Sequence, residues 1–291
     1  MIRTKSIHGG LSGIEMTDTE FDFGNGITIR KTYAHLTSPF VLALKPPGKY
    51  KHHDGPWKAA KGGVSFDIFA EIEVPFIDGS KKSFDQLELL WTIVSLLRLV
   101  KYPYISIPAI SDISFNKMLI SEADPVVNPH ETKPRIFGPP NSQKPKLSTD
   151  VLEWVKENLD TTMSLMKTDS KFYSAYKAFD SATEIGKSSA GLLTLWGAIE
   201  QLFSPSTGEL KYRVSANLAS FLSAHGEERL KLFKEISNLY NDRSTAAHTA
   251  KELDHSPLIA TWVHLRNALI KIIEDGKVPT QTDLEKLIFN V

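Results

Sequence analysis

The segment Leu239-Tyr240-Asn241-Asp242-Arg243-Ser244-Thr245-Ala246-Ala247-His248 places a permanent cation and a near-neutral acid/base five positions apart. It continues a helical pattern, because Leu230, Phe233 and Ile236 recur at three-residue spacing just before it. Arginine presents a planar fork of donors that suits phosphate, and histidine titrates near neutral pH. Cleavage of a phosphodiester without a metal needs such a pair, with one group on the phosphate and one beside the sugar hydroxyl. The segment therefore suggests nucleic-acid chemistry on a helical scaffold.

Outward from this segment, the whole C-terminal half has helical periodicity. Apolar residues recur on one face at three- and four-residue intervals, which is typical of helices that bury a stripe. The predicted helices span residues 150–167, 171–185, 192–203, 210–221 and 258–274. No longer period repeats along this half, so the pattern predicts a helical bundle and not a solenoid.

The N-terminal half carries strand patterns instead. Residues 64–74 alternate apolar and polar side chains, as a strand with one buried face does. Residues 27–33 and 39–44 are two further predicted strands, and residues 84–101 change to helical spacing. The fold class is therefore predicted as α+β, with a small antiparallel β-rich module and its covering helix preceding an all-α bundle.

A proline-rich segment separates the two halves. Six of the sixteen prolines lie between Pro125 and Pro145, a density that no helix or central strand tolerates. We therefore predict an N-terminal α+β module over 1–123, a linker over 124–147 and a helical domain over 148–291. The N-terminal module carries no recognisable catalytic set, so by elimination it would sense a trigger or hold the other domain inactive.

Composition limits the function classes. Lys and Arg number 34 and Asp and Glu number 34, so binding to nucleic acid would depend on local patches. The chain has no cysteine, which excludes disulfides, thiolate zinc sites and cysteine nucleophiles and fits a reducing cytoplasm. The N-terminal residues lack the apolar core of a signal peptide, and the longest apolar run, Leu87–Val100, is shorter than the about 20 residues that span a bilayer. We expect a cytoplasmic protein without a membrane partner.

The C-terminal half also resembles a known family, the HEPN domains, and in particular their ApeA-like branch. Residues 192–203 resemble the family's helix with a central glutamate, here Glu200, followed by a leucine and an aromatic residue. Residues 208–213 resemble the short turn into the next helix, and residues 239–248 resemble the family's arginine and histidine separated by four to six residues. The resemblance covers roughly residues 150–275.

This resemblance implies a metal-independent endoribonuclease that needs no cofactor and acts as a toxin or antiphage defence effector. Its active site would form where two subunits of a homodimer bring their motifs together, and an inhibitor, antitoxin or trigger protein is an expected partner. Arg243 and His248 are the catalytic candidates, with Asp242, Ser244 and Glu200 as supporting residues. Many active members carry Asn, Asp or His at the position that Ser244 occupies here.

Chemistry assigns roles to these residues. His248 would deprotonate or orient the ribose 2′-OH, or protonate the leaving oxygen, while Arg243 holds the scissile phosphate. RNA is required because DNA lacks the attacking hydroxyl. Five residues along a helix turn a side chain by about 140°. Either the helix breaks at Asn241-Asp242, or Arg243 and His248 reach a cleft from its two sides, as a two-fold dimer permits.

Other interpretations remain open from the sequence. The family contains non-catalytic members, so the bundle could be a dimerisation scaffold or RNA-binding module. Arg243 and His248 could also be a surface cation and a satisfied polar group. Glu200 could pair with Arg243 or Arg213, and a structural ion pair explains it as well as a catalytic contact does.

A basic loop in the N-terminal half is a second candidate for nucleic-acid binding. Its lysines contact phosphates in this interpretation, and its aromatic residues stack on bases; a solvated loop is the alternative. The loop contains Lys45, Lys49, Lys51, Lys58 and Lys61, with Tyr50 and Trp57 between them. Lys49, Lys51, Lys58 and the bundle's Arg213 are the predicted contacts. His52-His53-Asp54 could seed a metal site, but adjacent side chains on an extended segment point apart, so no metal site is predicted.

Overall fold

The chain folds into two compact units, a sheet unit and a helical unit. The computed structural model describes residues 6–49, 51–76, 84–133, 135, 145–204, 208–248 and 254–289. The sheet unit comprises Met1–Leu90, Ile105–Thr132 and Pro139–Thr149, and the helical unit comprises Trp91–Tyr104, Lys133–Gly138 and Asp150–Val291. An antiparallel sheet followed by helices is an α+β fold, as the sequence predicts.

The sheet unit contains a six-stranded antiparallel sheet in the order β3-β4-β5-β1-β6-β7. Its strands are β1 (Ser6–Ser12), β3 (Glu20–Gly24), β4 (Ile27–Ala43), β5 (Trp57–Pro75), β6 (Ser106–Ser111) and β7 (Val127–Pro129). Two shorter strands, β2 (Glu15–Met16) and β8 (Lys146–Leu147), pair in parallel. A 3₁₀ turn, η1 (Phe115–Lys117), follows β6.

The inner half of β5 has one buried face. Ile68, Ala70, Ile72 and Val74 are fully buried, which confirms the face that the alternating pattern predicts. The two strands predicted at 27–33 and 39–44 are wrong as separate elements, because both lie within β4. Residues 34–38 continue the ladder by pairing with residues 64–68, and the register shifts on either side of them.

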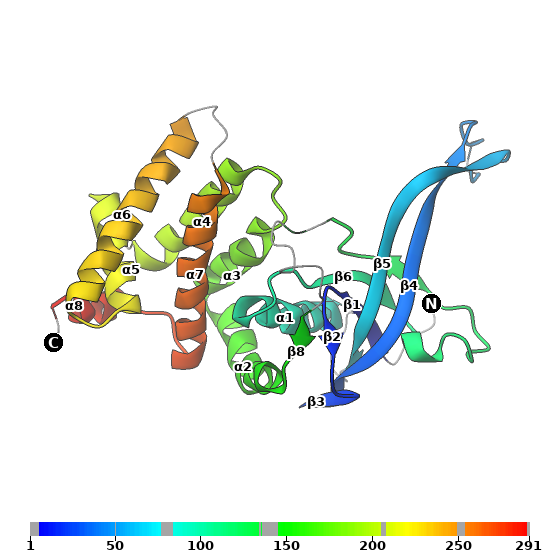
Figure 1. Ribbon diagram of the computed structural model, residues 1–291, viewed down its shortest axis with the longest axis horizontal. Helices are drawn as coiled ribbons and strands as arrows, with labels where there is room; N and C mark the ends of the chain where they lie inside the picture. The colour runs from blue at the N-terminus through cyan, green and yellow to red at the C-terminus, as the bar shows by residue number, and fades with distance from the viewer. Residues whose placement is uncertain are drawn as a thin grey trace. The chain divides into compact units, whose positions relative to one another are not determined.

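Only the inner halves of β4 and β5 belong to the wider sheet. Strand β3 pairs with β4 up to Arg30, and β1 pairs with β5 from Ala70 onward. Beyond these points, β4 and β5 pair with each other alone among the described strands, and Figure 1 shows them as one long curved ribbon. We call residues 37–65 the arm. Every side chain described in the arm is exposed except that of Ala60, which is half-buried.

The described part of the proline-rich segment contains two short strands that the sequence patterns do not predict. Val127–Pro129 forms the edge strand β7, where a proline is tolerated because one side of the strand makes no ladder bonds. Lys146–Leu147 forms β8, which pairs with β2. Positions 134 and 136–144 of the predicted linker lie outside the described residues.

The helical unit contains the C-terminal part of α1 (Phe84–Val100) and the helices that follow. These are α2 (Thr149–Thr168), α3 (Ser170–Ala182), α4 (Ser188–Phe203), α5 (Leu210–Leu222), α6 (Glu227–His248), α7 (His255–Asp275) and α8 (Gln281–Phe289). The sequence patterns missed α8. Its signal was present, because Thr280 and Asp283 exchange backbone-to-side-chain hydrogen bonds as a capping box does. Among the described residues, no helix combines the length and apolarity that a bilayer crossing requires.

A buried ionic cluster ties α1 into the helical unit. Arg98 donates from Nη1 to both carboxylate oxygens of Asp180, at 3.1 and 3.0 Å, and the Trp91 indole donates to the same carboxylate at 3.0 Å. Burial alone would raise the pKa of Asp180, but the charges of Arg98 and Arg135 outweigh it and hold that pKa below its usual value.

The observed division of the chain therefore differs from the predicted one. The predicted boundary at 148 leaves residues 91–104 with the N-terminal module, whereas their contacts place them with the C-terminal helices. Arg266 of α7 adds to these contacts by donating to the Leu99 carbonyl at 2.5 Å. Sequence patterns predict where helices and linkers lie, but they do not predict which helices pack together. A helix that is shared by two units is therefore assigned to the first unit along the chain.

Candidate functional site

The arginine and the histidine of the motif lie on one unbroken helix. Helix α6 runs from Glu227 to His248, which excludes the first of the two alternatives, a helix break at Asn241-Asp242. Leu239 and Ala246 on either side of these residues are buried, and their packing outweighs the local preference of Asn and Asp for helix ends. Arg243 and His248 are therefore separated by about 140° around the helix and about 7.5 Å along it.

Arg243 contacts α4. Its Nη2 lies 3.1 Å from Glu200 Oε1, with the arginine side chain 28% exposed and the glutamate side chain 19% exposed. The Arg243 guanidinium also lies over the Tyr240 ring, 5.4 Å from its centre. Its Nε is buried and has no hydrogen-bond partner among the described residues. The cation is thus held by one carboxylate and one ring, while part of it remains open to solvent.

Two aromatic residues support this contact. Trp196 of α4 is 1% exposed, and its ring meets that of Tyr240 edge to face with centroids 5.1 Å apart. The Tyr240 hydroxyl bonds to Glu200, which Arg243 also contacts. Burial, followed by the Glu200 charge, raises the pKa of Tyr240, so this hydroxyl stays protonated at neutral pH. Glu200 is therefore oriented from two sides by residues of α6.

His248 is the last residue of α6 and is exposed. Residues 249–253 after it lie outside the described residues. Helix α7 then begins with Asp254 as its N-cap, and His255 lies 2.7 Å through Nδ1 from the Ser188 hydroxyl. Since Arg243 turns toward α4 and His248 ends the helix in solvent, one chain does not bring the two candidates together.

The remaining predicted residues surround this region without forming a closed site. Asp242 and Ser244 are half-buried neighbours of Arg243 on α6. Arg213 is exposed on α5, and Arg243 is a partner of Glu200. Lys211, also on α5, donates to Asn241 Oδ1 at 2.8 Å, which brings a further cation to the motif.

Sequence reasoning missed the buried His264. His264 of α7 is 8% exposed and lies 3.0 Å through Nε2 from Glu235 of α6. It falls within the predicted 258–274 helix, near the apolar positions Leu265 and Leu269. A polar residue on such a stripe is a signal for a buried hydrogen bond. The contact joins α6 to α7.

No metal centre is evident in the described part of the chain, which holds no group of three or more acidic or histidine side chains suited to a metal ion. The His52-His53-Asp54 segment lies in the arm, and His53 Nδ1 is 3.2 Å from the Lys45 carbonyl. That contact occupies one ring nitrogen with a backbone group.

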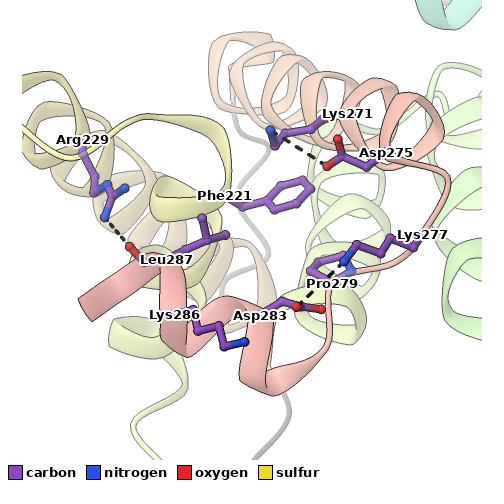
Figure 2. Close-up of a pocket in the computed structure, with 9 residues that line it drawn as sticks. All are labelled: Phe221, Arg229, Lys271, Asp275, Lys277, Pro279, Asp283, Lys286 and Leu287. Carbon is purple, nitrogen blue, oxygen red and sulfur yellow. Dashed lines mark hydrogen bonds and ion pairs between the residues drawn. The ribbon is translucent and has the colours of Figure 1, made fainter. Parts of the chain in front are cut away.

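A pocket of about 490 Å³ lies elsewhere in the helical unit, between α5, α7 and α8 (Figure 2). Arg229, which lines it, is 14 residues before Arg243 on α6, or about 21 Å along the helix. Two ion pairs lie in its lining: Lys271 is 4.0 Å from Asp275, and Lys277 is 3.9 Å from Asp283. With Arg229 and Lys286 the lining holds four basic and two acidic side chains, so the pocket is net positive and separate from the motif.

Comparison of the chain with protein-family models, with curated proteins and with solved structures finds no match.

Proposed function

We propose that the protein is a metal-independent endoribonuclease of the HEPN type, active as a cytoplasmic homodimer in a toxin or antiphage defence system. The proposal rests mainly on one observation: Arg243 is positioned by Glu200 with part of its guanidinium open, on the same helix that presents an exposed His248. The sheet unit would then sense a trigger or bind an inhibitor.

The proposed reaction uses the RNA's own 2′-OH. His248 takes the proton of this hydroxyl, the 2′ oxygen attacks the adjacent phosphorus, and the bond to the 5′ oxygen breaks. The leaving oxygen takes a proton, which gives a 2′,3′-cyclic phosphate and a free 5′-hydroxyl. Arg243 would neutralise the charge that grows on the phosphate in the transition state.

A dimer is needed because of the helix geometry. Residues about 140° apart on one helix do not face the same phosphate, whereas a two-fold axis between two α6 helices permits each Arg243 to lie opposite the partner's His248. Each dimer would then contain two composite sites.

A non-catalytic scaffold or RNA-binding module is the second candidate. The Arg243–Glu200 ion pair favours it, since a guanidinium engaged by a carboxylate is less available to phosphate. Under this alternative, Arg243 stabilises the contact between α4 and α6 and the protein has no hydrolytic activity.

Cleavage of labelled RNA in EDTA tests the proposal. We expect His248→Ala to slow cleavage by about 10²- to 10⁴-fold, the usual contribution of a general base. His225→Ala is the matched control, because His225 is exposed just before the opposite end of α6. A substrate with 2′-deoxy sugars should resist cleavage. Undiminished cleavage by His248→Ala would overturn the assignment, and no cleavage by wild type would favour the scaffold.

Mixing two inactive variants tests the composite site. Random exchange of Arg243→Ala and His248→Ala subunits makes half of the dimers mixed, and one of the two sites in each mixed dimer is intact. The mixture should therefore recover about a quarter of wild-type activity if each site draws on both subunits. No recovery after confirmed subunit exchange contradicts a site shared between subunits.

A further inference from the structure

The arm carries a local excess of positive charge. Residues 41–63 contain five lysines and one acidic residue, Asp54, in a chain whose 34 basic and 34 acidic residues balance overall. The arm contributes little to folding, because all but one of its described side chains are exposed and a two-stranded ribbon gains little stability by itself. The packing of the sheet unit therefore does not explain why these lysines are present.

The tip of the arm also presents an aromatic ring. Trp57 is 62% exposed, although its indole Nε1 donates to the His53 carbonyl at 3.1 Å. His53 is itself 3.2 Å through Nδ1 from the Lys45 carbonyl, so two contacts across the loop hold the indole in place. The ring thus has its polar atom satisfied and most of its surface free.

Strand register places the residues next to this ring. Trp57 is opposite Ala43, and Ala59 is opposite Val41. Because side chains alternate along a strand, Trp57 and Ala59 share one face and Lys58 falls on the other. The small alanine side chains leave the indole uncovered. The register shifts between Ala59 and Gly63, and Lys61 lies in this irregular stretch, four residues from Trp57. Two lysines therefore lie within four residues of the ring.

The geometry points to single-stranded RNA as the ligand of the arm, with the lysines on phosphates and Trp57 stacked on a base. This inference rests on the proposed function, since it assigns to the arm the capture of the substrate that the bundle would cleave.

An anionic membrane is the main alternative for a basic, partly apolar ribbon. The exposed Leu42 and Leu44 lie behind the tip, whereas Lys49 and Lys51 lie within the tip loop. Inserting the leucines into lipid would push these lysines into hydrocarbon first, which is costly. The order of charged and apolar residues along the arm therefore favours a phosphate backbone in water.

Fluorescence anisotropy tests the inference. The probe is a labelled oligouridylate of about 20 nucleotides, which is longer than the site that one single-strand-binding domain usually covers. The full chain carrying His248→Ala is used so that the RNA stays intact. Replacing Lys49, Lys51 and Lys58 by Gln should weaken binding about tenfold or more. It should also reduce the slope of the logarithm of the binding constant against the logarithm of the salt concentration by about 2, since each lost phosphate contact contributes about 0.7. Trp57→Ala should weaken binding about tenfold, with Trp57→Phe restoring most of it.

The matched control replaces Lys171, Lys231 and Lys234 by Gln. These lysines are exposed in the helical unit, so the same net charge is removed elsewhere. Equal loss in both triple variants, or no loss in the arm variant, overturns the inference. Vesicles of phosphatidylserine and phosphatidylcholine are tested in parallel, and arm-dependent binding to them without RNA binding also overturns it. Cleavage is assayed separately, so failure of the nuclease and failure of the arm are distinguishable.

Discussion

A single buried carboxylate organises the middle of the sheet unit. Glu71 is fully buried and accepts hydrogen bonds from the Ser114 hydroxyl at 2.5 Å and from the Phe115 backbone N–H at 2.7 Å. Arg30 approaches it at 3.4 Å, which compensates its charge. Glu71 thereby fixes the start of η1 against β5. His8 lies 3.9 Å away, and its Nδ1 is buried with no hydrogen-bond partner among the described residues.

We predict that His8 makes stability depend on pH. Burial lowers its pKa, as do the charges of Arg30 and Lys117, although Glu71 and Glu73 oppose the shift. His8 therefore binds a proton more readily in the unfolded chain than in the folded chain. As a result, the free energy of unfolding falls as pH drops below about 6.5. Above that value His8 is neutral in both states and has no effect. Urea unfolding at about pH 7.5 and about pH 5.5 measures the difference.

The control for this prediction is His8→Gln, which keeps a polar side chain without a titration near neutrality. Its free energy of unfolding should fall less between the two pH values than that of wild type. An equal fall in both proteins would assign the pH dependence to other groups.

At the scale of elements, β1 packs closely because it contains two glycines. A Cβ on Gly10 would lie 2.7 Å from Ile68 Cδ1 and 3.0 Å from Phe115 Cζ, and one on Gly9 would lie 2.7 Å from Leu90 Cδ1. Strand β1 sits between β5 and β6, so it has little freedom to move away. The glycines let η1 and the first part of α1 lie directly on the sheet.

We predict that Gly10→Ala destabilises the protein by about 1–3 kcal/mol, the usual cost of adding a methyl group to a full core. Gly48→Ala is the matched control in the same unit, where the new Cβ meets Lys51 at an ordinary contact distance of 3.6 Å. The control should change stability by no more than about 0.5 kcal/mol. Denaturant titration compares the two, and equal stability of both variants would show that the core can relax around Gly10.

Elements were predictable where one periodicity dominates. The alternation in residues 64–74 anticipated the buried face of β5, and the apolar stripe in 192–203 anticipated α4. The continuity of β4 was not predictable, because Pro39 suggests an interruption that the pairing with Gly63 accommodates. For the candidate site, the sequence suggested two possible partners of Glu200, Arg243 and Arg213. The sequence could not indicate that the packing of Ala246 keeps α6 helical throughout the motif.

At the scale of the molecule, α1 makes the two units interdependent. The helix begins in the sheet unit and supplies Trp91 and Arg98 to the helical unit, where both contact the buried Asp180. Neither unit is therefore a continuous piece of the sequence.

We predict that residues 148–291 alone form a much less stable protein than the full chain. The fragment keeps Asp180 but loses Arg98, Arg135 and Trp91, and an uncompensated buried charge costs about 3–5 kcal/mol. Thermal unfolding followed by circular dichroism should show a lower and broader transition. Asp180→Ala in the full chain removes the carboxylate that Arg98 and Arg135 share and should also destabilise strongly, although Arg135 keeps its ion pair with Glu184 at 2.7 Å. A fragment as stable as the full chain would contradict the shared role of α1.

The same helix also sets the order of events during synthesis. Arg98 is made 82 residues before Asp180, a distance that a ribosome covers in roughly 4 to 16 seconds. Throughout that interval the second part of α1 exposes an arginine and an apolar stripe whose partners do not yet exist. The nascent chain is then most open to chaperones and proteases, and codon choice between positions 98 and 180 becomes a determinant of how much protein reaches the folded state.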